Sequence, residues 1–188
     1  MTYAKALDIV LELEGGYANH PSDPGGATYR GVTQRTYDAY RKRQGLASCD
    51  VRNIDVPELQ AIYKTYWLPI CQEALEKGYG GLALTIFDMS VNAGPGNALK
   101  LYRPGDTAAT YSAKRIKYYQ SLNNWSVFGK GWTNRVMHIM IAAEAEHKVF
   151  LLAGGAPITV KAPLTVKGVV INPIGDKVYI RTTEISTD

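Results

Sequence analysis

The chain has 188 residues, of which 46% are apolar and 20% charged, values close to those of globular domains. They exclude disordered, collagen-like and coiled-coil chains, and the length suits one compact domain with a terminal extension. Lysine and arginine exceed aspartate and glutamate by 21 to 17, a net charge of +4. Such a mild excess suits an anionic partner but is too diffuse to indicate nucleic acid.

The two cysteines and the N-terminal segment give no sign of a disulfide, a metal site or a targeting signal. Cys49 and Cys71 form neither a disulfide framework nor part of a four-ligand zinc site, so we expect free thiols, no metal and no cofactor. Asp8 interrupts the first apolar run, and no run approaches the roughly 18 apolar residues of a membrane span. We therefore expect no signal peptide and no stable membrane insertion.

The first third of the chain predicts two helices around a loop and a small hairpin. Apolar residues recur at helical spacing over Tyr3–Glu14, and Gly15 and Gly16 end that helix. A polar loop rich in proline and glycine spans residues 19–26. Residues 28–32 then predict the hairpin, and Thr33 can cap a second helix over residues 34–44.

The remainder predicts further helices and a β-rich tail. Residues 55–58 have the pattern of a capping box that opens a helix. Residues 82–91 are apolar almost all round, which is typical of a central helix. Two more helices are expected over 108–122 and 132–152. After Gly155, β-branched and polar residues alternate, which favours a few short strands.

Glu14 is the first candidate for catalysis. It follows Leu7 by seven residues and Val10 by four, so it continues the apolar stripe and should point inward. Lost hydration disfavours the charged form of a carboxyl group, as a general acid requires. Glu12 is turned about 200° away and should be a surface charge. The alternative for Glu14 is a helix-terminal residue without a role.

Asp23 supplies a second carboxyl group on the following loop, nine residues after Glu14. Two carboxyl groups across a cleft are the arrangement that glycoside hydrolysis needs. The alternative is purely structural, because Asp-Pro-Gly-Gly is a good turn sequence in any protein.

Together these segments resemble glycoside hydrolase family 108, the N-acetylmuramidases found as phage endolysins and prophage-encoded lysozymes. The resemblance covers roughly residues 1–152. Its first motif lies in Glu14–Tyr17, Asp23–Thr28 and Gly31–Thr33, its second in Phe87–Gly96, and the start of a peptidoglycan-binding part in Arg115–Tyr119, Phe128–Trp132 and Arg135–Val136.

The resemblance implies a mainly α, lysozyme-like fold with a small hairpin near the active site and a short β-rich C-terminal tail. It implies cleavage of the β-1,4 bond between N-acetylmuramic acid and N-acetylglucosamine in peptidoglycan. Glu14 matches the catalytic acid, while Asp23 and Thr28 match a second carboxylate and a hydroxyl near the attacking water. Tyr17 and Asn92 are the candidates for substrate binding, although Asn92 equally suits a helix-terminal turn.

Three regions are expected: a lysozyme-like catalytic region over 1–100, a helical part over 101–154 that resembles a shortened peptidoglycan-binding region, and the tail over 155–188. The connection between Leu101 and Tyr111 is shorter than the family's usual one, so the late helices can instead complete the catalytic fold. The tail can anchor the enzyme to a phage partner, associate with copies of itself, or pack on the same domain.

The leading hypothesis is a muramidase that acts on peptidoglycan glycan strands with inversion. A lytic transglycosylase, which needs no positioned water, is the second. A catalytically silent wall-binding or virion component is the third, although such a protein has no need of an inward carboxylic acid. Without a visible signal peptide, we expect the protein in the host bacterial cytoplasm with release by a separate factor, or in the virion.

Overall fold

The computed structural model describes residues 1–19, 26–152, 165–166, 169–174 and 177–182, with side chains described as far as residue 146. The chain divides into two compact units, residues 1–155 and residues 156–188, which are treated separately below. Asp23 lies outside the described residues.

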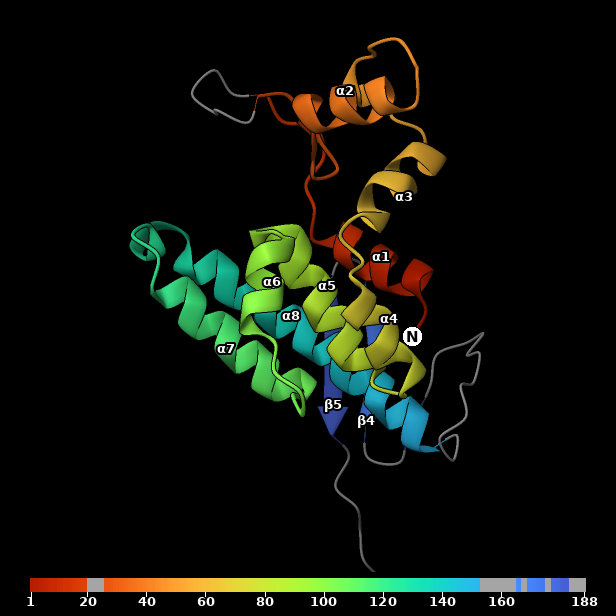
Figure 1. Cartoon of the computed structure of the whole chain (residues 1–188). Coiled ribbons are helices and arrows are strands. Elements are labelled where there is room, and N and C mark those ends of the chain that lie inside the picture. Colours follow the sequence, from red (N-terminus) through yellow and green to blue (C-terminus); the bar gives the residue numbers. More distant parts are fainter. Residues whose placement is uncertain (20–25, 153–164, 167–168, 175–176, 183–188) are drawn as a thin grey trace, which may run out of the picture. The chain divides into compact units, whose positions relative to one another are not determined.

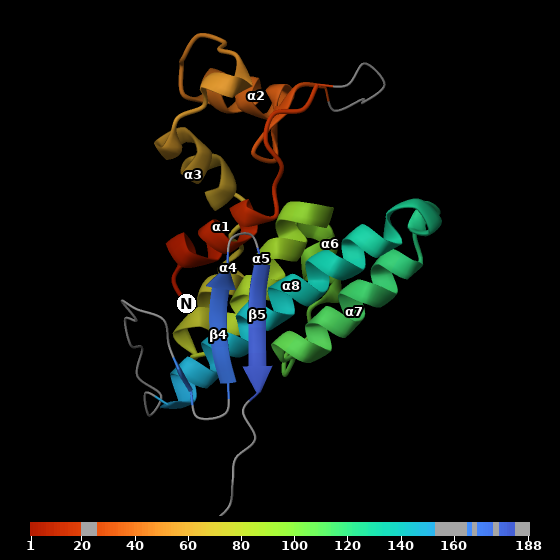
Figure 2. The same cartoon turned by 180° about the vertical axis from the view of Figure 1, so that it is seen from behind.

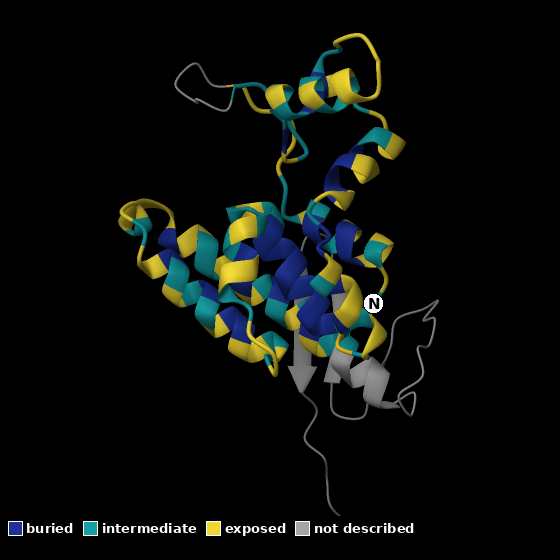
Figure 3. Ribbon diagram, in the orientation of Figure 1, coloured by how far each residue is buried: buried dark blue, intermediate teal, exposed yellow. Residues whose placement is uncertain are grey.

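The first unit is built around α5, as the apolar run at residues 82–91 predicted. Figure 3 shows α5 as a nearly continuous buried segment, and every residue from 81 to 90 is buried. Around it pack α1, α4, α6, α7 and α8 (Figures 1 and 2). The helices are α1 Tyr3–Glu12, α2 Gln34–Arg43, α3 Val56–Lys64, α4 Pro69–Glu76, α5 Gly80–Ala93, α6 Pro95–Leu101, α7 Ala108–Gln120 and α8 Trp125–Leu152, with a 3-10 turn, η1, at Val51–Asn53. The mainly α prediction is therefore confirmed.

Side-chain caps mark the starts of α1, α2, α3 and α7. The Thr33 hydroxyl accepts a hydrogen bond from the backbone of Thr36 at the start of α2, and Asp55 and Glu58 form the predicted capping box of α3. Helices α4 and α6 were not predicted. Each has proline at its first position, which suits a helix start, but each is too short to show a helical period.

The predicted hairpin is formed by β1, Thr28–Tyr29, and β2, Val32–Thr33, which pair antiparallel. Its two turn residues have positive φ, 49° at Arg30 and 76° at Gly31. Positive φ at both central residues is the requirement of a type I′ turn, which matches the twist of a hairpin. The hairpin precedes α2, and a bridge between Ala18 and Thr28 ties the segment after α1 to it.

The second unit contains the strands that the alternation after Gly155 predicted. They are β3 Thr165–Val166, β4 Val169–Ile174 and β5 Lys177–Thr182, in an antiparallel order β3-β4-β5 in which Ile171 lies opposite Ile180. The expected division of the helical part near residue 100 stays a prediction. Among the described helices, none is both long enough and apolar enough to cross a membrane.

Candidate active site

Glu14 lies just beyond the end of α1. The helix ends at Glu12, and the backbone N–H of Glu14 still bonds to the carbonyl of Leu11 at 3.2 Å. The Glu14 side chain is 16% exposed, whereas that of Glu12 is 68% exposed. The inward orientation predicted for Glu14 and the outward one predicted for Glu12 are both confirmed, although Glu14 is not itself helical.

A row of alternating charges connects Glu14 to the centre of the unit. The guanidinium of Arg135 on α8 lies 2.8 Å from a Glu14 carboxyl oxygen. The same guanidinium bonds to Asp88 on α5, with Nε 2.9 Å from Oδ1. Asp88 is fully buried and also pairs with the fully buried Arg115 of α7. The two carboxylates and the two guanidinium groups, which come from four parts of the chain, thus neutralise one another's charge.

Both guanidinium groups remain charged despite their burial. Desolvation acts to lower the pKa of Arg135, but the neighbouring carboxylates Asp88 and Glu14 outweigh it and raise this pKa. At Arg115, burial likewise acts to lower the pKa, but the carboxylate of Asp88 outweighs it, so this pKa is also raised. Arg135 thus carries a full positive charge that Asp88 and Glu14 share.

The turn of the hairpin lies directly against Glu14. A Cβ atom added at Gly31 would be only 2.8 Å from Glu14 Oε2, and closer still to the Tyr63 hydroxyl. That hydroxyl donates to the carbonyl of Arg30 at 2.8 Å and so fixes the turn to α3. Burial, and then the negative charge of Glu14, raise the pKa of Tyr63, which therefore keeps its proton.

Replacing Gly31 should damage both fold and site. In Gly31→Ala the positive φ is strained, at a cost of about 1–3 kcal/mol in unfolding free energy, and the new methyl group displaces Glu14. Gly45→Ala is the matched control, because Gly45 has φ +71° but no atom within 4 Å of an added Cβ. Urea unfolding should show a loss for both variants, and a larger one for Gly31→Ala because its methyl group also meets Glu14 and Tyr63. Peptidoglycan hydrolysis under native conditions should fall only in Gly31→Ala. Equal activity in the two would show that Gly31 does not position Glu14.

The other residues predicted for the site have varied surroundings. The Thr28 hydroxyl on β1 donates to the carbonyl of Gly26 at 3.1 Å. Tyr17 is 43% exposed, and the Arg52 guanidinium carbon lies 5.2 Å from the centre of its ring. Asn92, at the end of α5, is exposed and accepts a hydrogen bond of 2.6 Å from Tyr119. The structure brings Asn92 to the same groove as Arg135, the partner of Glu14.

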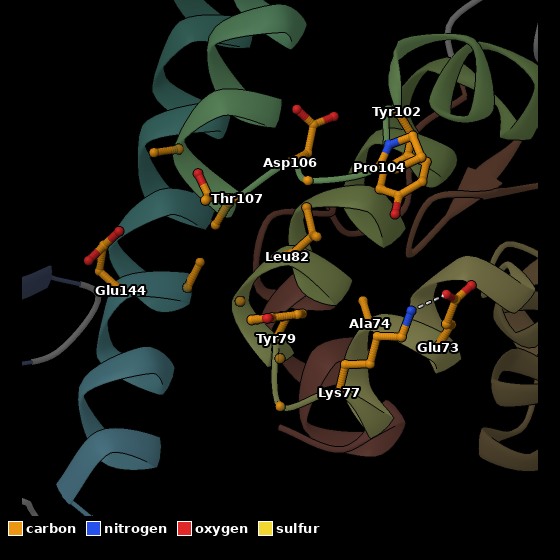
Figure 4. Close-up of a pocket in the computed structure, with 17 residues that line it drawn as sticks. Glu73, Ala74, Lys77, Tyr79, Leu82, Tyr102, Pro104, Asp106, Thr107 and Glu144 are labelled. Atoms are coloured by element: carbon orange, nitrogen blue, oxygen red, sulfur yellow. Dashed lines mark hydrogen bonds and ion pairs between the residues drawn. The ribbon is translucent and has the colours of Figure 1, made fainter. Parts of the chain in front are cut away.

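That groove has a volume of about 540 Å³ and lies where α1, α5 and α8 meet. A larger cavity, of about 680 Å³, lies at the other end of α5 and is shown in Figure 4. There Tyr79 and Leu82 face the loop around Pro104. Glu14 lines neither cavity, but its partner Arg135 lines the smaller groove, which makes that groove the candidate for the catalytic one. The groove residues are Leu13, Asn92, Val127, Phe128, Gly131, Trp132, Asn134, Arg135 and His138.

Comparison with known proteins identifies the family. The model of glycosyl hydrolase 108 matches residues 7–94, which include Glu14, the hairpin and Asp88. Residues 7–94 belong to glycosyl hydrolase family 108. The chain is also similar to the solved structure of Brucella abortus SagA, with a TM-score of 0.62 and 26% identity over 78% of this chain and 95% of that one. No curated protein matches the chain.

The match over residues 7–94 supports a lysozyme-like glycoside hydrolase that acts on peptidoglycan. The matched residues contain both acids of the charged row. The two arginines come from α7 and α8, beyond the match. The family fold and the late helices therefore build the environment of Glu14 together.

Sequence analysis placed Asp88, Arg115, Arg135 and Gly31 inside the family-like motifs but gave none of them a role of its own. For Asp88 a further signal was present, because a carboxylate inside an apolar central helix is almost never fully buried without a partner. Nothing in the sequence shows which helix faces α5, so the pairing of the two arginines with Asp88 could not be predicted. Within the described residues, no group of three or more His, Cys, Asp or Glu side chains is arranged to hold a metal ion.

Proposed function

We propose that this family 108 enzyme is an N-acetylmuramidase. It cleaves the β-1,4 bond between N-acetylmuramic acid and N-acetylglucosamine, with Glu14 as the general acid. The observation that carries the proposal is the position of Glu14, a largely buried carboxyl group held by Arg135, which itself lines an open groove. A partly desolvated acid at the edge of a groove is placed to protonate a bridging oxygen of a bound polymer.

In the proposed reaction, Glu14 gives its proton to the glycosidic oxygen as the bond from that oxygen to C1 of N-acetylmuramic acid breaks. Water attacks C1 from the opposite face of the sugar, and Asp23 accepts a proton from that water while Thr28 helps to position it. The configuration at C1 is inverted. Mutual backbone bonds of 2.9 and 2.8 Å join Ala18 to Thr28, on either side of the segment that carries Asp23.

Arg135 acts as a positioning residue for Glu14. Its guanidinium fixes the carboxyl group by an ion pair and shares its charge with Asp88. An acid held in one orientation loses less freedom when it reaches the reacting oxygen. Tyr17 and Asn92 are proposed to contact the glycan.

Arg135→Met should lower kcat/KM roughly 10²-fold, because the acid loses its fixed orientation. KM for soluble glycan fragments should change little, because the loss lies in the orientation of the acid and not in binding. Arg135→Lys keeps a cation at this position and should restore most of the lost activity. A loss that lies in KM alone, or one that Arg135→Lys does not restore, would contradict the assignment.

Digestion of purified peptidoglycan tests the proposed bond. The soluble fragments are reduced with borohydride and identified by mass spectrometry. A muramidase leaves every new reducing end on N-acetylmuramic acid. New reducing ends on N-acetylglucosamine would show cleavage of the other glycosidic bond, and 1,6-anhydro ends would show a lytic transglycosylase. Either result would overturn the proposal.

A further inference from the structure

The second unit contains a sheet whose two faces differ in composition. Figure 2 shows β4 and β5 side by side and running in opposite directions. Residues directly opposite each other in such a sheet lie on the same face, and successive residues along a strand lie on alternate faces. The register therefore assigns one face to Val166, Val169, Ile171, Pro173, Val178, Ile180 and Thr182. We call it the apolar face, because it contains no charged residue and Thr182 is its one polar member.

The opposite face, here the basic face, is mostly polar. The same register places Asn172 opposite Tyr179, and Lys177 and Arg181 lie on this face as well. Its residues are Thr165, Val170, Asn172, Ile174, Lys177, Tyr179 and Arg181. Lysine and arginine are almost never fully buried without a partner. The basic face therefore suits contact with water, whereas the apolar face needs a cover.

Within the described residues, the second unit supplies no other layer. Those residues are 165–166, 169–174 and 177–182, and all of them belong to the sheet. A sheet with one apolar face must bury that face against another layer. Residues 156–188 also contain no cysteine and no histidine, so neither a disulfide nor a zinc site with such ligands can replace that layer. The apolar face therefore requires a partner.

We propose that the apolar face packs against the same face of a second copy of this chain. The absence of charge on the face favours this occupant, because two identical uncharged faces meet without repulsion. A twofold axis makes one surface complementary to itself, and stacked sheets pack about 10 Å apart. A charged polymer would instead select the basic face. The register thus favours self-association among the roles that the sequence left open for the tail.

Pairing through the strand edges is the other way in which sheets associate, and the composition of the strands opposes it. The outer strands of the sheet are β3 and β5. Lys177 and Arg181 both lie in β5, and charged residues on an outer strand oppose pairing with another edge. β3 has only two residues, and such short outer strands offer little backbone for pairing. The copies therefore meet through their faces.

The mass of the full chain in solution tests the proposal. Sedimentation equilibrium should give a dimer, with twice the chain mass of 20.7 kDa. Ile171→Asp places a carboxylate on the apolar face and should raise the dimer Kd at least about 100-fold, equivalent to about 2.8 kcal/mol. The matched control is Asn172→Asp, which adds the same charge at the next residue, on the basic face. Its Kd should stay within about threefold of the wild-type value.

Hydrogen exchange of the wild-type chain guards against a variant that merely loses the sheet. Exchange of the amides in β4 and β5 should slow as the protein concentration rises through the dimer Kd, because dissociation uncovers the sheet. Exchange in α5, which belongs to the first unit, should not change. None of these measurements involves hydrolysis, so the proposed function is tested independently of the dimer.

Three results would overturn the proposal. The first is a wild-type chain that is still monomeric at about 0.1 mM, where even a weak dimer forms. The second is a dimer that Asn172→Asp dissociates as readily as Ile171→Asp does. The third is exchange in β4 and β5 that does not depend on protein concentration.

Discussion

Glu14→Gln is expected to lower peptidoglycan hydrolysis by about 10²–10⁴-fold, the usual contribution of a general acid. The amide has nearly the shape of the carboxyl group and can still bond to Arg135, but it has no acidic proton for the leaving oxygen. The rate of turbidity loss of a purified peptidoglycan suspension measures this effect. Circular dichroism and thermal unfolding should show a folded variant.

Glu12→Gln is the matched control, because Glu12 lies two positions earlier with its side chain 68% exposed. Its activity should equal that of the wild type. Comparable losses in both variants would point to general damage at the end of α1. Wild-type activity in Glu14→Gln would remove Glu14 from the mechanism.

Asp88→Asn is expected to have the largest effect on stability. The substitution preserves shape but leaves Arg115, fully buried, and Arg135, 12% exposed, without their shared counter-charge. Breaking a buried ion pair by removing one partner typically costs about 3–5 kcal/mol. The free energy of unfolding in urea should fall by this amount, with the m-value unchanged.

Asp50→Asn provides the contrast, since the pair of Asp50 with Arg52 is exposed to solvent and such pairs contribute little. It should unfold at nearly the wild-type urea concentration. If Asp88→Asn did the same, the buried charges would not depend on one another for stability.

The sequence carried enough local information to predict most of the framework. Periodicity indicated the central helix, a Thr cap and an Asp–Glu capping box placed the starts of α2 and α3, and the segment at 28–32 indicated the hairpin. The start of α8 was placed too late, at residue 132 instead of Trp125. Gly129 and Gly131 resemble helix breaks in sequence, but Gly129 is where the helix packs against the Trp125 ring.

The site could be predicted only from its acid. Extending the helical spacing of α1 two residues beyond its end at Glu12 predicted that Glu14 points inward, which is correct. Its partner Arg135 is 121 residues away in sequence, and pairing over such a distance depends on how α8 packs against α5 and α1. For the same reason, the sequence could not show that Phe128, named there only as part of a peptidoglycan-binding segment, lines the same groove as Arg135.

The measurement that tests the central claim most directly is digestion of purified peptidoglycan in heavy-oxygen water, followed at once by reduction and mass spectrometry. The account predicts that the wild-type enzyme places one heavy oxygen at C1 of each newly formed N-acetylmuramic acid end, and that Glu14→Gln forms almost none of this product. Fragments without the label, or with the label on N-acetylglucosamine, would contradict it.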